Sequence, residues 1–590
     1  MKSVYFSLIM LCVVLISTQA QNSKNDSVLL NRELTLEKEY NPDIDNAIKV
    51  NQLPELREPQ APKSIVEFSN YTVPYSTQHG IYYLPIQSYA SEIERLNKIG
   101  YLTAGLSSLL DIDGDLGVLI LNNSQNHLSI QASHRSSNSN VSYLHYDEKQ
   151  KMKINDNWGS VNFAHDFGKL RLNLGTKYTY SGFNYYGPNS IVDPIYYTHP
   201  GVVEPLFIDK KTNQINNLFE IEVGVTSSET EDYSYLLNFD YKRFAQKYGS
   251  FTDEDGRNEN QFGIGAGAGY KFSDEMRLGV QGNFRNFSYS SIAAAYQDNT
   301  YGNQDYSLIT LNPYLDFQGF DWKLRLGIRE DFQIGGRKKA NLAPDIHFNY
   351  VFNRRFQFDI SATGGIKANS NYNLFYENRY VDPSLRITDS RTPLNADLRL
   401  NYLILDNLKI GAFGGYEFIK DEHFLATVPI YRTDDMDRRT ILHGQSMQPF
   451  YEDVNLFKFG FSTDYSHQDI FEFKLKGIFN SWTRQESIDG LDFVPYGKPN
   501  FIGDLNIAYK FDAIPLRLDA YYRLETGRKF WQTEDKNNSI NDLSLKGSYL
   551  FNSTLSFYLK ANNLLFQDYE FWYGYPAQGF NIMGGLSVKF

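Results

Sequence analysis

Apolar and polar residues alternate along most of this chain, from about residue 100 to its end. In the last stretch, one face carries Phe580, Ile582, Leu586, Val588 and Phe590, and the other carries Asn581, Met583, Ser587 and Lys589. A period of two predicts a strand that is apolar on one side only. The pattern continues to the final residue, Phe590, where soluble proteins usually fray. We therefore expect this strand to close an even-numbered antiparallel barrel, although an edge strand of a soluble β-sandwich has the same pattern.

Upstream strands carry glycine or charge on the face opposite the apolar one. Between 262 and 270, glycine occupies every second position. Elsewhere Trp322, Leu324, Leu326 and Ile328 alternate with Lys323, Arg325, Gly327 and Arg329, and Leu516, Leu518, Ala520 and Tyr522 alternate with Arg517, Asp519, Tyr521 and Arg523. Unpaired charges would destabilise a sandwich core by several kcal/mol each. They are tolerated on the inside of a barrel with a polar lumen, which is the fold that this pattern favours.

Five of these residues are candidates for lining the lumen. They are Arg325, Arg329, Arg517, Asp519 and Arg523. The arginines could line a path for anions. Alternatively, they could pair with inward acids such as Asp519 and fill the lumen. The sequence leaves both interpretations open.

Short and long connections alternate along the barrel region. Tight turns are expected at 166–169, 228–231, 272–275, 318–321, 352–355, 405–407 and 511–513, and long polar segments at 183–215, 246–258, 290–303, 368–391, 421–451, 484–499 and 528–540. Short turns on one side and long loops on the other are typical of outer-membrane barrels, and the hairpins add up to about 22 strands, with a range of 18 to 22.

Two local expectations accompany this count. The first hairpin should pair Gly100–Leu109 with Leu116–Leu121 through the acidic stretch Asp111–Asp115, which we interpret as a turn rather than a calcium loop. Aromatic residues near strand ends, as in 183–186 and 571–573, should form girdles at the membrane interfaces.

The beginning of the chain has a different character. Met1 and Lys2 precede a short apolar run and small residues up to Ala20, the pattern of a cleaved secretory signal over residues 1–20. The run is too short for a membrane helix, and it contains Cys12, the single cysteine. Residues 21–96 are rich in proline, which predicts an extended segment in the lumen or the periplasm. We expect the barrel to occupy residues 97–590.

Composition narrows the functional classes. Aromatic residues make up 15% of the chain and the mean hydropathy is only −0.45, as strands that face lipid on one side require. The net charge of −12 argues against nucleic acid as a partner. His423, His443 and His467 are scattered, and no catalytic motif or metal-ligand spacing is present. We therefore expect neither an enzyme nor a cofactor-binding or metal-binding protein.

The C-terminal region resembles that of TonB-dependent receptors. An Asn563-Leu564-Leu565 turn, the loop Tyr573-Gly574-Tyr575-Pro576 and the final strand ending on Phe590 carry the resemblance. It implies a 22-stranded barrel in the outer membrane of a Gram-negative bacterium, with a folded plug domain and uptake of a small solute. The segment 21–96 is shorter than that family's plug, so it would be a reduced plug or a periplasmic tail.

Two functions remain open at this stage. The barrel is either transporter-like and takes up a small solute, or it is a non-transporting subunit or scaffold of a multi-protein outer-membrane complex. Outer-membrane lipid is the expected surrounding in both cases. A surface lipoprotein or a periplasmic protein is the expected partner in the second.

Overall fold

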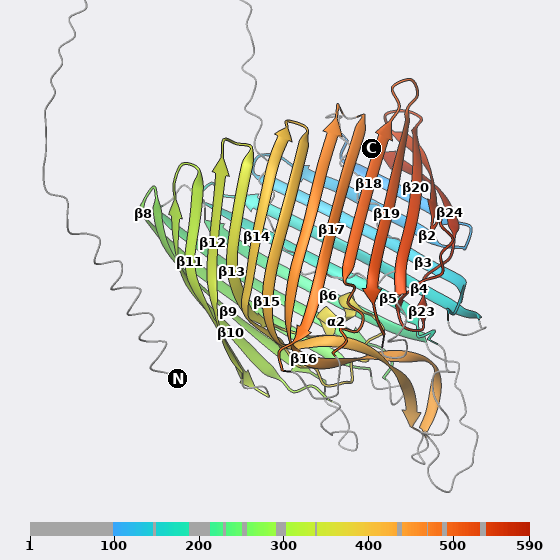
Figure 1. Cartoon of the computed structure of the whole chain (residues 1–590), viewed down its shortest axis with the longest axis horizontal. Coiled ribbons are helices and arrows are strands. Elements are labelled where there is room, and N and C mark those ends of the chain that lie inside the picture. Colours follow the sequence, from blue (N-terminus) through green and yellow to red (C-terminus); the bar gives the residue numbers. More distant parts are fainter. Residues whose placement is uncertain are drawn as a thin grey trace, which may run out of the picture. The chain divides into compact units, whose positions relative to one another are not determined.

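The structure, a computed structural model, describes residues 98–144, 149–187, 213–227, 232–249, 256–290, 302–336, 339–433, 439–468, 470–486, 493–530 and 538–590. The expected signal and the proline-rich segment lie outside these residues. The described part of the chain forms a closed antiparallel barrel of 22 strands, which confirms the predicted fold class (Figure 1).

Each barrel strand pairs with the next one along the chain. The first half consists of β1 (Gly100–Ser107), β2 (Ile112–Asn122), β3 (Asn126–Ser142), β4 (Lys149–Asp166), β5 (Leu170–Asn184), β6 (Asn213–Ser227), β7 (Tyr233–Gln246), β8 (Asn258–Ser273), β9 (Met276–Tyr289), β10 (Tyr306–Gln318) and β11 (Trp322–Gly335). The second half consists of β12 (Ala340–Phe352), β13 (Phe356–Lys367), β14 (Ser390–Leu405), β15 (Leu408–Thr433), β16 (Arg439–His467), β17 (Phe471–Arg484), β18 (Phe501–Lys510), β19 (Leu516–Arg528), β20 (Asn538–Leu550), β21 (Leu555–Asn562) and β24 (Asn581–Lys589).

The first and last strands close the barrel. β1 and β24 are antiparallel, with Leu102 opposite Val588. Beyond the strand ends, the carbonyl oxygen of Phe590 accepts hydrogen bonds from the backbone N–H groups of Ile99 at 2.7 Å and Gly100 at 2.9 Å, and its own N–H donates to Gly100 at 3.0 Å. Closure leaves no unpaired sheet edge, which a membrane requires because lipid cannot satisfy backbone groups.

Side chains alternate between lipid and lumen as the sequence predicted. On β8, Ile264 is 41% exposed on the outside, whereas the intervening glycines face polar side chains of β7. A Cβ at Gly263 would lie 2.3 Å from a carboxylate oxygen of Asp240, and one at Gly265 would lie 2.3 Å from the side-chain oxygen of Asn238. Glycine is therefore needed on this inner face to make room for the polar side chains of the neighbouring strand.

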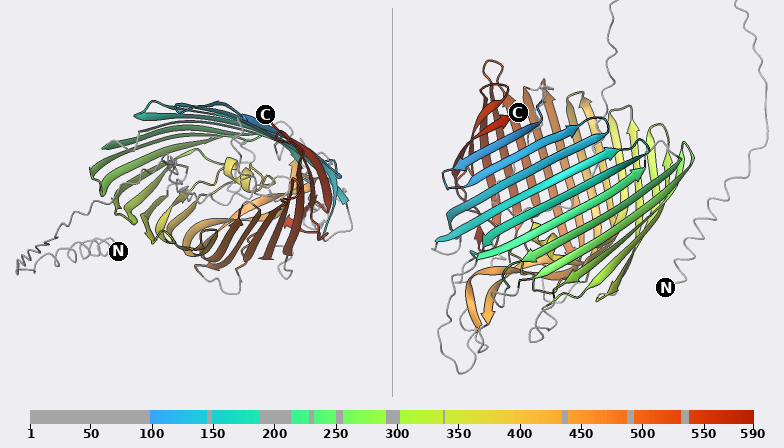
Figure 2. Two further views of the ribbon diagram at one scale, coloured as in Figure 1. Left: turned by 90° about the horizontal axis from the view of Figure 1, so that it is seen from above. Right: turned by 180° about the vertical axis from the view of Figure 1, so that it is seen from behind.

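Short turns gather at one end of the barrel, the turn side, and longer connections at the other, the loop side (Figures 1 and 2). Exposed aromatic residues ring the turn side, among them Phe167, Phe272, Phe320 and Phe551, where an interfacial girdle is expected. No helix in the described ranges is long and apolar enough to cross a membrane.

One turn was predicted at the wrong place. The first hairpin turns at 108–111, and Ile112–Asp115 belong to β2. Asp111 ends the turn, where its carboxylate accepts the hydroxyl of Ser107 at 2.6 Å. Asp113, Gly114 and Asp115 instead pair with β1. The Asp-Gly pair was misleading because its flanking acids lie on the tolerant inner face of a polar barrel.

Candidate functional site

The loop-side mouth of the barrel is filled by two folded connections. Residues 368–389 join β13 to β14 and contain α2 (Asn371–Glu377), and residues 563–580 join β21 to β24 and contain β22 (Glu570–Trp572) and β23 (Tyr575–Pro576). We call the two connections together the mouth cap. Figure 2 shows α2 inside the ring of strands. The sequence had predicted a long polar loop at 368–391, but the loop folds inward.

The beginning of α2 is held by the wall on the β6–β8 side. The hydroxyl of Ser370 accepts the N–H of Asn373 at 3.1 Å, as an N-cap residue does. The carboxylate of Glu259, fully buried at the start of β8, accepts the N–H groups of Asn371 at 2.6 Å and Tyr372 at 3.4 Å. The helix start supplies N–H donors that have no partner within the helix, and these donors offset part of the cost of burying Glu259.

Tyr372 continues this attachment one strand further. Its hydroxyl donates to Glu220 of β6 at 2.9 Å, and the ammonium group of Lys242 lies 5.6 Å from the centre of its ring. Burial raises the pKa of Tyr372, so it stays protonated and acts as a donor.

Arg379 fixes the cap to β4 and β5. Its guanidinium group contacts both carboxylate oxygens of Asp156, at 2.7 and 3.0 Å, and it donates to the hydroxyl of Ser181 at 3.2 Å. The Arg379 side chain is only 5% exposed. Such a bidentate pair is among the stronger ionic contacts, and loss of one partner would leave a charge buried without compensation.

The end of α2 meets the opposite wall. Glu377 accepts from Nε2 of His423 on β15 at 2.6 Å, and Lys498, from the β17–β18 connection, lies 3.8 Å from Glu377 and 3.5 Å from Glu422. Burial by itself would raise the pKa of Glu377, but His423 and Lys498 lower it well below its usual value. Burial likewise opposes the charge of Lys498, yet Glu377 and Glu422 raise its pKa. The ammonium group of Lys498 therefore lies between two carboxylates of opposite charge, those of Glu377 and Glu422.

An aromatic core packs the rest of the mouth. The ring of Tyr380 stacks on Tyr575 with centroids 3.9 Å apart, and Tyr186 meets Tyr575 edge-on at 4.9 Å. The residues of this core include Phe183, Tyr185, Tyr186, Leu374, Phe375, Tyr380, Tyr569, Phe571, Trp572 and Tyr575. The prediction that 183–186 and 571–573 form an interfacial girdle was wrong. Residues 571–573 belong to the cap itself, and the aromatic side chains of 183–186 pack against the cap, so both groups are buried.

The 563–580 connection carries its own polar anchors. The guanidinium group of Arg528 on β19 pairs with Glu525 and donates to the carbonyl oxygens of Gly497 at 2.8 Å and Phe571 at 3.2 Å. The amide of Gln578 donates to Asp111 at 2.8 Å. The second half of the cap is thus attached to the hairpin that begins the barrel and to β19.

Nearer the turn side, the inner wall contains a polar hollow of about 460 Å³. Strands β3 to β7 form it, and its lining includes His127, Asn162, Arg171, Asn173, Glu222 and Asp240. Both charge signs and several amides face it, so it suits a small polar solute better than an apolar one.

The five lumen candidates lie in two separate groups. On β11, Arg325 donates to Asp316 at 2.7 Å, and Arg329 contacts Asp331 at 3.1 Å. On β19, Arg517 donates to Asp519 at 2.9 Å and Glu472 at 3.0 Å, while Arg523 donates to Glu525 at 2.7 Å and lies 3.5 Å from Asp504. Only Arg517 and Asp519 are brought together as a pair, and each arginine has an acidic partner.

Sequence reasoning missed the residues that hold the mouth cap. Glu259, Glu377 and Lys498 come from connections or strand ends, and the residues that each of them contacts lie far away in the sequence. The signal that could have found the cap is the aromatic content of 372–380, which is high for a solvated loop. Within the described ranges, no cluster of His, Cys, Asp or Glu side chains is suited to a metal ion.

Comparison with known proteins gives a structural match but no match by sequence. No protein-family model matches the chain, and no curated protein does. The FrpB iron transporter of Neisseria meningitidis superposes with a TM-score of 0.59 at 11% identity, over 84% of this chain and 81% of that one. The ferric-catecholate import receptor Fiu of E. coli K12 gives 0.57 at 11% identity, over 84% and 82%.

The copper transporter OprC matches in the same way, with a TM-score of 0.56 at 11% identity, over 84% of this chain and 81% of that one. These proteins are TonB-dependent receptors. The present chain has the barrel fold of TonB-dependent receptors. Its closed ring of strands and its apolar outer surface are the features of a membrane-spanning β-barrel. The neighbours are transporters and receptors, and at this identity the likeness concerns the fold.

Proposed function

We propose that this barrel is a gated transporter for a small polar solute, closed at its loop side by the mouth cap. The observation that carries the proposal is the attachment of 368–389 to opposite walls of one lumen. Arg379 and Tyr372 contact β4 to β6, and Glu377 contacts β15. The contacts are mainly ionic and hydrogen-bonded, and such contacts can be exchanged for water when a segment moves.

The hollow beneath the cap supports a polar solute. Its charges and amides lie on strands β3 to β7, below the part of the wall that holds α2. The known neighbours carry iron, ferric catecholates or copper by their descriptions, which supports uptake as the class of activity. The proposal assigns no catalytic step to this chain.

Single-channel conductance in planar bilayers tests the proposal. We expect the full chain to conduct little, and a variant with 371–387 replaced by a short Gly-Ser linker to show discrete, larger steps. Lys247→Gln, a charge change on the loop side outside the cap, is the matched control and should behave like the full chain. If the linker variant stays closed even after removal of residues 21–96, the transport proposal fails.

A second candidate function is a non-transporting subunit that binds partner proteins at the cell surface. The observation that favours it is the length of β15 and β16, which have 26 and 29 residues, whereas about 9–11 residues cross a membrane. The hairpin that they form extends beyond the wall (Figure 1), and it offers a surface for a lipoprotein. A stoichiometric partner that co-purifies with the full chain and is lost when 428–445 are removed would support this function.

A further inference from the structure

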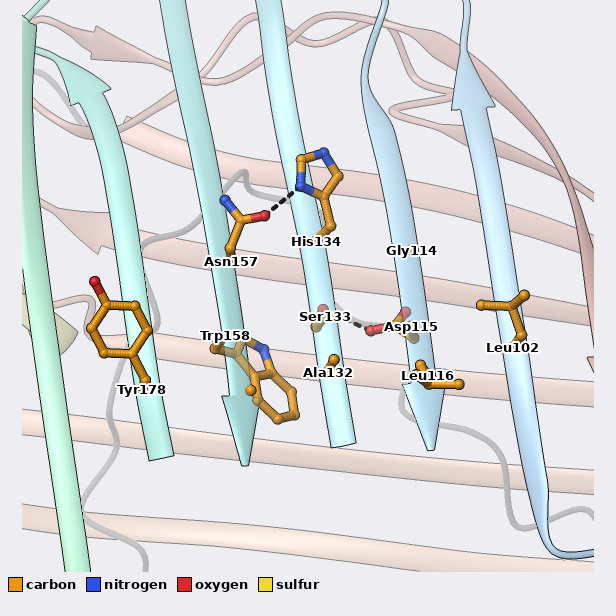
Figure 3. A pocket seen from close by; sticks show the side chains of 11 residues that line it. Leu102, Gly114, Asp115, Leu116, Ala132, Ser133, His134, Asn157, Trp158 and Tyr178 are labelled. Carbon is orange, nitrogen blue, oxygen red and sulfur yellow. Dashed lines mark hydrogen bonds between the residues drawn. The ribbon is translucent and has the colours of Figure 1, made fainter. Parts of the chain in front are cut away.

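The lipid-facing surface of strands β1 to β5 contains a hollow of about 350 Å³ (Figure 3). One row of register partners crosses it, from Leu102 and Leu116 through Ala132 and Gly159 to Tyr178. The side chains become small in the middle of this row and large again at Tyr178. The exposed faces of Leu102 and Tyr178 form the two rims.

The small residues keep the hollow open without being required by the backbone. A Cβ at Gly159 would meet nothing closer than the carbonyl oxygen of Gln131 at 3.7 Å, and one at Gly114 would meet nothing within 3.8 Å. Larger side chains would therefore fit at both positions. The hollow exists because these two positions lack larger side chains, and not because neighbouring strands approach each other closely.

A hydrogen-bonded row lies directly on the loop side of the hollow. His134 Nδ1 and the side-chain oxygen of Asn157 are 2.7 Å apart, and His134 Nε2 is 3.1 Å from the hydroxyl of Ser136. The amide of Asn157 donates to Asn155 at 2.8 Å. Polar side chains on the outside of a barrel belong at the level of lipid headgroups rather than of acyl chains.

Three lysines continue this outer face of β4 toward the loop side. Lys149, Lys151 and Lys153 occupy alternate positions, and all three are exposed. Across the strand pair they face Ser142, Asn140 and Asn138 of β3, which carry no charge. Clusters of lysine next to a membrane attract anionic headgroups.

The lysines, the polar row and the hollow lie at three successive depths on β4. Four residues separate Lys153 from Asn157 and two separate Asn157 from Gly159, or about 13 and 7 Å of strand. With the usual barrel tilt of about 40°, these distances correspond to roughly 10 and 5 Å of depth. The hollow therefore begins just below the polar row at headgroup level, and the lysines lie above that row. A lipid whose phosphate contacts the lysines would place its acyl chain in the hollow.

We propose that this surface is a binding site for one phosphorylated lipid of the outer leaflet. The phosphate contacts the lysines, the polar part below it contacts His134 and Asn157, and an acyl chain occupies the hollow between Leu116 and Tyr178. The loop side is the outer side of the membrane, so the lipid is of the lipid A type rather than a phospholipid of the inner leaflet.

Native mass spectrometry of the delipidated full chain tests the site, with diphosphoryl lipid A as the probe. Lys149→Gln combined with Lys151→Gln and Lys153→Gln should weaken binding at least tenfold by removing the charge. Gly159→Leu should weaken it at least tenfold by filling the hollow. Lys247→Gln and Ala268→Leu, the latter on the outer face of β8, are matched controls and should bind as the full chain does.

Two further lipids test which part of the lipid the site recognises. Dephosphorylated lipid A and phosphatidylglycerol should each bind at least tenfold more weakly than diphosphoryl lipid A. Each variant must also remain a heat-resistant barrel on gel electrophoresis. Lys149→Arg combined with Lys151→Arg and Lys153→Arg should bind as the full chain does, because these changes keep the positive charges. The proposal is overturned if the triple variant and Gly159→Leu bind diphosphoryl lipid A like the controls, or if Gly159→Leu instead releases a co-purifying protein.

Discussion

The two ends of this barrel differ in how their inward-facing charged side chains are paired and buried. On the loop side, Arg379 is 5% exposed and its partner Asp156 is attached to a folded cap. Nearer the turn side, Arg325 is 33% exposed and pairs with Asp316 on the neighbouring strand. The first pair joins segments far apart in the chain, whereas the second joins adjacent strands.

The difference teaches which contacts determine closure. A pair that is about one-third exposed and joins neighbouring strands contributes little, because water competes and the strands are already held by their backbone hydrogen bonds. A buried pair between a loop and a wall has no such support. Breaking the Arg379–Asp156 pair should loosen the mouth cap. Breaking the Arg325–Asp316 pair should mainly change the charge of the lumen.

The largest effect is expected from Arg379→Met. The variant leaves the Asp156 carboxylate, which is only 18% exposed, with the Ser181 hydroxyl but without its charged partner, and this should lower the free energy of unfolding by about 3–5 kcal/mol. Urea titration of the refolded protein in micelles measures the change. The double variant with Asp156→Leu should recover most of the loss; if it is no more stable than the single variant, the pair is not the cause.

A similar but smaller loss is expected from Phe183→Ala. Phe183 is 3% exposed and packs edge-on against Tyr185 and Tyr380, so removal of its ring should cost about 3 kcal/mol. Phe320→Ala on the turn side, where the ring is 99% exposed, is the control and should change stability by less than about 0.5 kcal/mol. Equal losses in the two variants would contradict a packed mouth.

The sequence predicted the wall of this protein much better than its mouth. Alternation with a period of two is a local signal, so the strands, the inner glycines of β8 and the closing strand at Phe590 could be derived from it. The mouth depends on contacts such as Glu259 with Asn371 or Gln578 with Asp111, which join residues far apart in the chain. No local pattern encodes such pairs, and the buried aromatics at 571–573 have the composition of an interfacial girdle.

Acid should open the mouth. The pKa of Glu377 is lowered in the folded state by His423 and Lys498, against the opposing effect of burial. The stabilisation is therefore complete above the usual glutamate value of 4.5 and is lost as the pH falls below it toward the lowered value. Conductance should rise as the pH falls from 5 toward 3, and Glu377→Gln should reduce this dependence. An unchanged profile in that variant would exclude Glu377 as the acid-sensitive contact of the cap.

The smallest effect on stability is expected from Arg325→Gln. The pair with Asp316 lies between adjacent strands and is partly exposed, so its loss should cost only about 0.2–1 kcal/mol.

The functional effect of Arg325→Gln should appear only after the cap is removed, because the full chain is closed. In the 371–387 linker variant, Arg325→Gln should shift the reversal potential toward cation preference, since it removes a positive charge from the lumen. Lys247→Gln in the same background should leave that potential unchanged. If Arg325→Gln and Lys247→Gln shift the reversal potential equally, ion selectivity is set at the mouth rather than along the turn-side wall. The proposed difference between the two ends of the barrel would then be wrong.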